Sequence, residues 1–294
     1  MFKLSLILKT SVILTENYTC FFTFNSQNNS LLFYLYIVKY NVEYFSLSFL
    51  LRMDLKGVIF MDLKYKRVLL KLSGEVLSGD KGHGFDFNVM NNICGAIKTV
   101  VDAGAEVGIV VGGGNFWRGR SSGDMDRTRA DSIGMLATVM NSLALQETFL
   151  QLGIDARVQS AVQITGVVET FNKDSAVRHL EKGRLVIFAG GTGNPFFSTD
   201  SGAALRAAQI GADVVLKATN VDGIYDKDPN KFSDAVKFTE ISHNELLERH
   251  LAVMDTAAAA ICQENNIPIL VFNLNNPENI AKAMCGENTG TVVK

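Results

Sequence analysis

Two lysines and one aspartate have side chains and sequence positions that could perform chemistry. Lys71 lies between leucines in the apolar run RVLLKLSG (67–74), and Lys217 lies in a second apolar run, ADVVLKATN (212–220). An unpaired ammonium group is costly to bury, so such a lysine indicates a function, and phosphate binding suits a compact positive charge. Asp200 ends the stretch GTGNPFFSTD. We expect this carboxylate to orient the two lysines or to hold Mg²⁺; the alternative is a helix N-cap.

Glycine-rich segments follow four of the apolar runs: KLSGE, GGGNFWRGR, GGTGNPFFSTD and KATNVDGIYDKDP. Glycine lets backbone N–H groups approach phosphate oxygens, and a following helix N-terminus adds further donors. One such segment alone is more often a tight turn than a ligand contact. Four of them at the same edge of a parallel sheet indicate a phosphate site.

The elements that must position these residues alternate regularly after Lys66. Apolar runs that end in glycine, such as 106–114 and 184–191, alternate with helical patterns such as 88–104 and 130–153. This alternation predicts an α/β fold, a three-layer sandwich with a mostly parallel central sheet covered by helices on both faces. In such sheets ligands bind beyond the carboxyl ends of the strands.

Several classes of protein are excluded. The chain has neither GxxxxGK[ST] nor a GxGxxG with a spaced acidic residue, which argues against P-loop and dinucleotide enzymes. Four distant cysteines (Cys20, Cys94, Cys262 and Cys285) and four scattered histidines form no metal motif, and we expect the histidines on the surface or in loops. A net charge of -2 suggests neither nucleic acid nor an anionic membrane as partner. A reducing cytoplasm fits this cysteine usage.

Residues 1–60 differ from the rest of the chain. They are rich in Phe, Tyr, Leu, Ile, Ser and Asn, and Lys39 and Glu43 interrupt their best apolar span. We predict an apolar, aromatic-rich extension that reflects a mis-called start or is unstructured, with residues 61–294 as the functional domain. A membrane-associated or targeting extension and an integral part of the fold are the alternatives.

Residues 61–294 resemble the bacterial uridylate (UMP) kinases of the amino acid kinase superfamily. The resemblance rests on YKRVLLKLSGE, VVGGGNFWRG, DSIGMLATVMN, GTGNPFFSTDS and VVLKATNVDGIYDKDP, of which the GTGNPFF loop is the most specific. It implies transfer of the γ-phosphoryl group of ATP to UMP, giving UDP and ADP, in pyrimidine nucleotide (CTP/UTP) biosynthesis. It also implies Mg²⁺ held mainly through the ATP phosphates, a homohexamer, and possible activation by GTP and inhibition by UTP.

The resemblance also assigns roles to individual residues. The catalytic group is Lys71, Lys217 and Asp200. The ATP-binding residues are Lys71, Leu72, Ser73, Gly74, Gly114, Arg118, Thr219, Asn220, Tyr225 and Asp228. The UMP-binding residues are Gly113, Asp131, Thr192, Gly193, Asn194, Pro195, Phe196, Phe197, Ser198 and Thr199. Residues Gly79, Asp80, Lys81, Gly82, His83 and Gly84 align with a segment that contacts allosteric GTP.

Alternative interpretations remain for some residues and for the activity. Asp131 could be an N-cap, Tyr225 could serve packing, and Asp226 with Asp228 could form an Asp-Pro turn. The acceptor could instead be a carboxylate or carbamate, as in acetylglutamate or aspartate kinases. The protein could also be a non-catalytic nucleotide-binding protein on the same fold.

Overall fold

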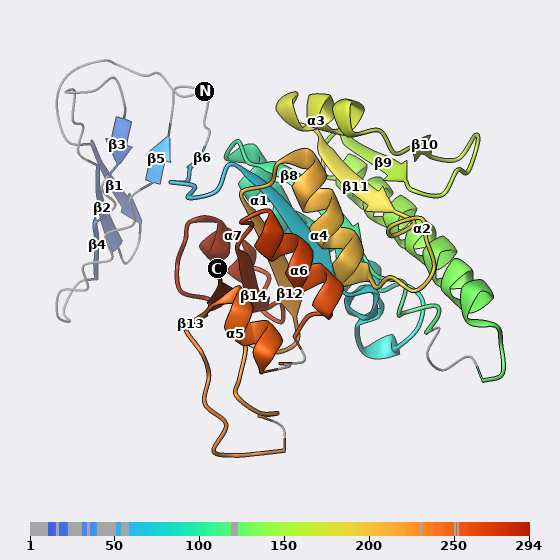
Figure 1. Cartoon of the computed structure of the whole chain (residues 1–294). Helices are drawn as coiled ribbons and strands as arrows, with labels where there is room; N and C mark the ends of the chain where they lie inside the picture. Colours follow the sequence, from blue (N-terminus) through green and yellow to red (C-terminus); the bar gives the residue numbers. More distant parts are fainter. Residues whose placement is uncertain are drawn as a thin grey trace. The chain divides into compact units, whose positions relative to one another are not determined.

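The computed structural model describes residues 61–118, 123–229, 231–249, 251 and 253–294 in full, and six short backbone strands within residues 1–60 (Figure 1). Contacts within the chain divide it into two compact units, Met1–Asp62 and Leu63–Lys294.

The first unit contains two small antiparallel sheets. One is formed by β1 (Ser11–Thr15), β2 (Tyr18–Phe22) and β4 (Tyr36–Lys39), and the other by β3 (Leu31–Phe33), β5 (Leu51–Met53) and β6 (Ile59–Phe60). Whether residues 1–60 belong to the native protein stays a prediction.

The second unit is built on one nine-stranded sheet in the order β10-β9-β11-β8-β7-β12-β14-β15-β13. Every neighbouring pair is parallel except β14 and β15, so the predicted mostly parallel sheet is confirmed. The strands are β7 (Arg67–Leu72), β8 (Glu106–Val111), β9 (Ala156–Ser160), β10 (Glu169–Thr170), β11 (Leu185–Ala189), β12 (Val214–Thr219), β13 (Glu240–Ile241), β14 (Ile269–Asn273) and β15 (Gly290–Val293). The chain runs from β7 outward to β8 and later returns to β12 on the other side of β7. Such a switch point is where open α/β sheets bind ligands.

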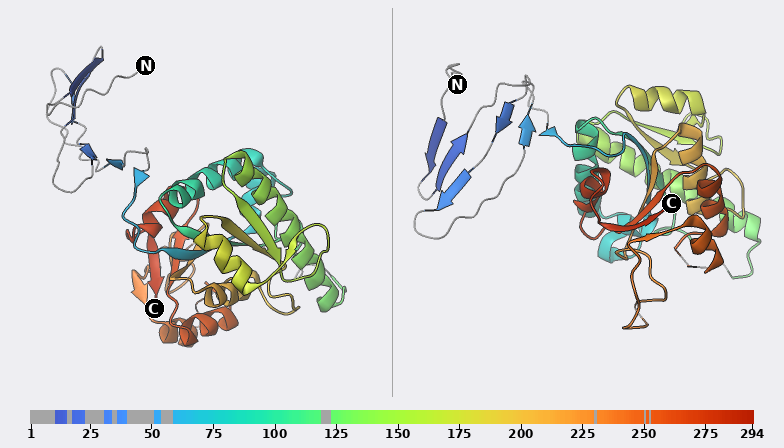
Figure 2. Two further views of the ribbon diagram at one scale, coloured as in Figure 1. Left: turned by 90° about the horizontal axis from the view of Figure 1, so that it is seen from above. Right: turned by 60° about the vertical axis from the view of Figure 1, so that its left-hand side comes forward.

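Helices cover both faces of the sheet (Figures 1 and 2). On one face α1 (Phe87–Asp102) packs against α2 (Arg127–Gln151) and α7 (Asn279–Met284). On the other, α4 (Thr199–Ile210) packs between α3 (Lys173–Glu181) and α6 (Thr256–Glu264), and α5 (His243–Glu248) packs on α6. A 3-10 helix, η1 (Gly74–Lys81), follows β7 directly.

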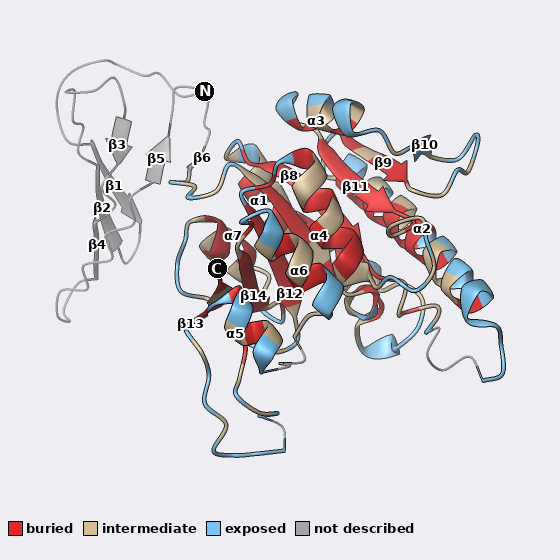
Figure 3. Ribbon diagram, viewed as in Figure 1, coloured by how far each residue is buried: buried red, intermediate tan, exposed pale blue. Residues whose placement is uncertain are grey.

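The core lies where the helical layers meet the central strands. Strands β8 and β11 are buried at every position, which is why their sequences are continuous apolar runs rather than alternating ones. Figure 3 shows the central strands and the sheet-facing sides of α4 and α6 as buried. This packed scaffold holds the strand ends, where the polar residues stand, in fixed positions.

One alternative and one expectation about single residues are wrong. Asp131 is not the N-cap of α2, because that helix begins earlier and Asp126 accepts the N–H of Arg129 as its cap. His243 is buried rather than on the surface, because it opens α5, which packs on α6. Burial lowers the pKa of His243.

Three of the four cysteines lie in the fully described part of the chain. Cys94, Cys262 and Cys285 are free thiols, and burial raises the pKa of Cys94 and of Cys262 to about 12. Among the described residues, no helix combines the length and the apolar character needed to cross a bilayer.

Candidate active site

Lys71 and Lys217 lie side by side at the carboxyl edge of the sheet. They are direct partners in the parallel register of β7 and β12, so both side chains point to the same face. Their side chains are only 14% and 9% exposed. Two ammonium groups held this close repel each other unless an anion lies between them.

Asp200 is that anion in the structure. Its Oδ1 lies 2.9 Å from Lys71 Nζ and its Oδ2 lies 2.5 Å from Lys217 Nζ. Burial by itself would raise the pKa of Asp200, but the two lysines outweigh it and hold the pKa below its ordinary value. Burial lowers the pKa of Lys217, and Asp200 opposes that shift. The carboxylate therefore stays charged at neutral pH and holds the ammonium groups of both lysines close together.

The N-cap alternative for Asp200 does not hold. Ser198 caps α4, because its Oγ accepts the N–H groups of Asp200 and Ser201. The side chain of Asp200, in the first turn, is thereby free to turn toward the lysines.

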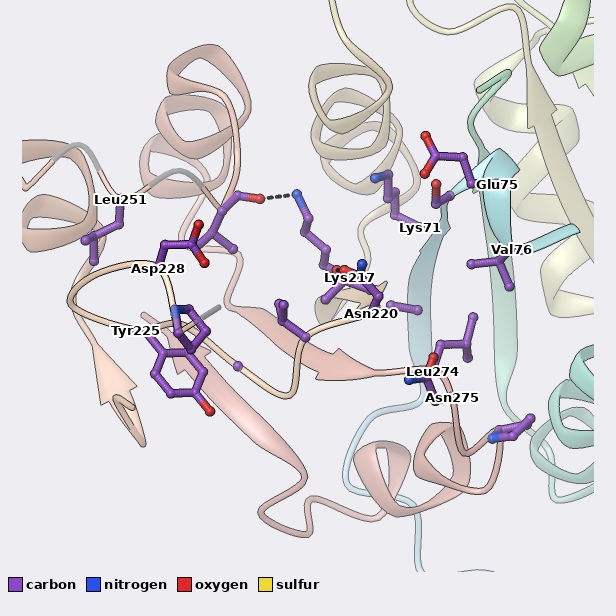
Figure 4. Close-up of a pocket in the computed structure, with 18 of the residues that line it drawn as sticks. Lys71, Glu75, Val76, Lys217, Asn220, Tyr225, Asp228, Leu251, Leu274 and Asn275 are labelled. Atoms are coloured by element: carbon purple, nitrogen blue, oxygen red, sulfur yellow. Dashed lines mark hydrogen bonds between the residues drawn. The ribbon is translucent and has the colours of Figure 1, made fainter. Parts of the chain in front are cut away.

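Two supporting groups were missed by sequence reasoning. Lys217 Nζ also donates to the carbonyl oxygen of Val253, the bond drawn in Figure 4. Asp255 accepts hydrogen bonds from Ser198 Oγ and from Ser201 Oγ, the latter at 2.8 Å, and caps α6. The position of Asp255 directly before the helix TAAAAICQE could have suggested a helix cap. Its contact with Ser198, 57 residues earlier, could not be inferred from the sequence.

A cleft of about 1020 Å³ opens from the lysines along β12. Six of the residues predicted to bind ATP line it, together with the catalytic candidate Lys217: Lys71, Ser73, Thr219, Asn220, Tyr225 and Asp228. Figure 4 shows Lys71 and Lys217 pointing to the same side, with Tyr225 and Asp228 on one wall and Glu75 and Val76 on the opposite wall. The cleft is large enough to hold a nucleotide.

The far end of the cleft is built by local hydrogen bonds. Tyr225 Oη donates to Asp222 at 2.7 Å, and Lys237 donates to the same carboxylate at 3.0 Å. Asp226, which also lines the cleft, accepts the N–H of Val236 at 2.7 Å and so stabilises the loop.

Four of the predicted ATP residues lie outside the cleft lining. Leu72 is fully buried in the core. A β-carbon at position 74 would lie 2.3 Å from the carbonyl oxygen of Gly112. Glycine is therefore required where the segment after β7 approaches the segment after β8. Arg118 pairs with Glu75 at 2.6 Å, and Gly114 lies beside that same carboxylate. The glutamate was not predicted, although it stands in the motif KLSGE.

The loop after β11 carries most of the predicted acceptor residues, and none of residues 192–199 lines the cleft. Phe196 and Phe197 are 62% and 52% exposed, which is unusual for two adjacent aromatic side chains. Phe196 has a left-handed backbone, φ 71°, and its N–H donates to Asp131 at 2.8 Å. Asp131 also pairs with Arg127, whose guanidinium lies 5.3 Å from the Phe196 ring centre. Asp131 thus holds the aromatic loop in the structure.

The rest of this loop is a tight turn. Thr192 Oγ1 accepts the N–H of Asn194, and Gly193 has φ 82°; a side chain there would meet Ala161 at 3.2 Å. A side chain on Gly113 would meet Ala137 and Gly134 of α2 at 2.9 Å. The close approach of β8 to α2 therefore explains Gly113 without a ligand, and its predicted contact with UMP stays a prediction.

Comparison with known proteins accounts for this arrangement. Residues 66–273 match the model of the amino acid kinase family. The chain belongs to the amino acid kinase family.

Three solved structures are similar to this chain over most of its length. A UMP kinase from Bacillus anthracis is 36% identical over 78% of this chain and 96% of its own, with a TM-score of 0.76. One from Ureaplasma parvum is 38% identical over 79% of this chain and 100% of its own, with a TM-score of 0.75. A uridylate kinase from Archaeoglobus fulgidus is 32% identical, covers 77% and 99%, and has a TM-score of 0.59.

The predicted effector segment of this amino acid kinase, residues 79–84, is a surface turn at the end of η1. Gly79 and Gly82 have left-handed backbones, and Lys81 pairs with Asp86 at 3.5 Å. The His83 ring meets Phe116 edge-on at 5.4 Å. Gly79 also lines the cleft. A role for this segment in GTP binding stays a prediction.

The described residues of this amino acid kinase contain no group of three His, Cys, Asp or Glu side chains able to hold a metal ion. Mg²⁺ in phosphoryl transfer needs only one or two protein carboxylates, because nucleotide phosphates and water complete its coordination. Asp200 Oδ1 is buried and accepts no hydrogen bond, although it faces the Lys71 ammonium. The site is thus compatible with Mg²⁺ brought by ATP, with Asp200 as the candidate protein ligand.

Proposed function

We propose that this protein is a UMP kinase that transfers the γ-phosphoryl group of ATP to UMP, giving UDP and ADP. One observation carries the proposal: two buried lysines share Asp200 between a nucleotide-sized cleft and an exposed aromatic loop. Solved UMP kinases that are 36% and 38% identical, and are covered almost whole, support it.

The acceptor chemistry needs no general base. The phosphate of UMP has a second pKa of about 6 and is already ionised at neutral pH. A phosphate oxygen of UMP attacks the γ-phosphorus of ATP while the bond to the β-bridging oxygen breaks, and ADP leaves with that oxygen. Catalysis then consists of bringing two anions together and neutralising the charge on the transferred group.

The residues of this chain divide that work. Lys71 and Lys217 present two positive charges where the transferred group passes, and Asp200 keeps them in place. Mg²⁺ supplies neutralisation of the ATP phosphates when it is bound. Thr219, Asn220, Tyr225 and Asp228 line the donor end, and the loop with Phe196 and Phe197 offers flat apolar surface to the uracil ring.

We also propose that the enzyme assembles as a homohexamer in the cytoplasm, serves pyrimidine nucleotide synthesis and responds to GTP and UTP. Support for self-association comes from α2, where Ile133, Leu136, Met140 and Leu150 are large, apolar and at least 36% exposed. Their spacing places them along one stripe of the helix, a surface that association with another copy would bury.

Release of ADP with different acceptors tests the activity. The full chain with ATP and Mg²⁺ is assayed with UMP, CMP, dUMP, acetylglutamate and aspartate in turn. We expect the highest kcat/KM with UMP. A higher value with either amino acid substrate would identify a carboxylate kinase, and tight ATP binding without turnover on any acceptor would indicate a non-catalytic protein.

Phe197→Ala is expected to raise the KM for UMP more than the KM for ATP, because the aromatic loop lies on the acceptor side of Asp200. Loss of one aromatic stacking surface typically costs on the order of 1 kcal/mol, about fivefold in KM. Initial rates at varied concentrations of each substrate measure both constants. An equal or larger effect on the KM for ATP would place the loop at the donor site.

A chain that begins at Met61 is expected to fold, assemble and phosphorylate UMP like the full chain. The nine-stranded sheet and every predicted site residue lie after that position, and contacts separate the two units after Asp62. Thermal unfolding, gel filtration and the UMP assay compare the two chains. Insolubility or inactivity of the shorter chain alone would mean that residues 1–60 belong to the fold.

A further inference from the structure

Arg206 is a buried charge that the proposed reaction does not use. It lies on α4, two turns after Asp200, and is only 3% exposed. Within the described part of the chain, no carboxylate lies within 4 Å of its guanidinium. Burial lowers the pKa of Arg206 to about 10, so the group is still protonated at neutral pH. Burial of a cation without a carboxylate partner costs free energy. The other groups that Arg206 contacts must therefore offset this cost.

The guanidinium holds the start of the acceptor loop. Its Nη2 donates to the carbonyl oxygen of Gly191 at 3.2 Å, and its Nη1 donates to Gln209 Oε1 at 2.5 Å. Its plane lies over the ring of Phe171, 3.8 Å from the ring centre. Phe171 in turn packs edge-on against Phe188 of β11, at 5.8 Å. Arg206 therefore links α4 to Phe171, which precedes the N-cap of α3, and to Gly191, which follows β11.

The backbone at that point is otherwise free to choose other conformations. Gly190 and Gly191 are consecutive and both left-handed, with φ 73° and 56°. Glycine adopts such angles without a steric penalty and equally adopts others, so two in a row define no single path for the chain. Three contacts select the observed path: Thr138 Oγ1 accepts the N–H of Gly190, Gly202 of α4 closely approaches Gly191, and Arg206 binds the Gly191 carbonyl.

We propose that Arg206 is a positioning residue for the acceptor: by fixing the Gly191 carbonyl it sets the path of residues 192–198 and so the affinity for the nucleoside monophosphate. Arginine suits this task because its planar group can stack on Phe171 and donate in two directions at once. Lysine offers a point charge on a flexible stem and cannot do both. This inference rests on the proposed function, in which residues 192–198 bind UMP.

Steady-state kinetics of three variants test the role. In Arg206→Met we expect the KM for UMP to rise about tenfold, because a charged donor to the loop is lost, while the KM for ATP changes little. Arg206→Lys should show a smaller rise in the same direction. Arg67→Met is the matched control: Arg67 also donates to a carbonyl of α4, that of Ile210, but at the opposite edge of the sheet. It should lower the melting temperature without separating the two KM values.

A fourth variant keeps the proposal testable if Arg206→Met does not fold. Phe171→Leu removes the stacking surface and leaves every hydrogen bond of Arg206 available. It should raise the KM for UMP severalfold, and it replaces Arg206→Met in the test if that variant does not fold. Unchanged KM for UMP in folded Arg206→Met or Phe171→Leu, or equal changes in the KM for ATP, would overturn the proposal.

Hydrogen exchange separates this inference from the proposed function, because it needs no substrate. Amides of residues 190–197 should exchange faster in the Arg206 variants, whereas those of β7 and β12 should not change. If the wild-type protein releases no ADP with UMP, the proposed function fails while this readout still decides on Arg206. Exchange in the loop that equals wild type would overturn its positioning role.

Discussion

Lys71→Met is expected to lower kcat about 10²–10³-fold while the protein stays folded. The ammonium of Lys71 lies 2.9 Å from Asp200, and in the proposed reaction both substrates meet there, so it should meet negative charge that is greatest in the transition state. Loss of one preorganised charged donor in a water-poor site typically costs on the order of 3–4 kcal/mol in activation free energy. Methionine keeps a long apolar stem on β7, so the core beside it should survive.

Lys71→Arg separates charge from geometry in this prediction. The planar guanidinium is not a compact point charge, and Lys217 and Asp200 already surround the position, so activity should be restored only in part. Steady-state kinetics with thermal unfolding as the folding control measure both variants. A folded Lys71→Met enzyme with kcat close to wild type would remove Lys71 from the catalytic residues and leave Lys217 as the main candidate.

Asp200→Asn is expected to lower both activity and stability. Its carboxylate pairs with two lysines and is only 15% exposed, so the amide leaves two nearby ammonium groups uncompensated. Breaking a buried ion pair by removing one partner costs about 3–5 kcal/mol in the free energy of unfolding, and partial exposure favours the lower figure. Without the carboxylate to orient the lysines, kcat should fall about 100-fold. Denaturant unfolding at pH 7 and steady-state kinetics measure the two effects.

The stability difference between wild type and Asp200→Asn should depend on pH in one direction. The folded-state pKa of Asp200 lies below its unfolded value of about 3.9, so its contribution is fully present above that pH. It is lost as the pH falls through the lower folded pKa. Unfolding measured between pH 7 and acid should therefore show the two curves converging below about pH 4. Curves that stay parallel would mean that the carboxylate is not paired with the lysines in solution.

The fold could be predicted from the sequence because its strands are buried on both faces. Continuous apolar runs that end in glycine, such as 106–114, became β8 and the segment after it, and the helical pattern at 88–104 became α1. The two-residue strands β10 and β13 were not predicted, since two residues hold no hydrophobic period. The 3-10 helix η1 was missed for a similar reason: its sequence, GEVLSGDK, has no apolar periodicity.

The site was predictable where a residue type was anomalous in its local sequence. A lysine among leucines and paired phenylalanines beside glycine indicated Lys71, Phe196 and Phe197 without any structure. Glu75, Asp255 and Arg206 were not predicted, because each is a residue type that is common in its local sequence context. Their partners, Arg118, Ser198 and the Gly191 carbonyl, are distant in sequence and come together only through the packing of the sheet and helices.

Identification of the phosphorylated product tests the central claim most directly. The full chain is incubated with ATP, Mg²⁺ and an equimolar mixture of UMP, CMP, dUMP, acetylglutamate and aspartate, and the products are resolved by phosphorus NMR, with Lys71→Met as the background control. We predict that the ADP formed equals the sum of the phosphorylated products, that UDP is the main one, and that Lys71→Met forms it far more slowly. Acyl phosphate as the main product, or ADP without UDP, would contradict the assignment of this site to UMP.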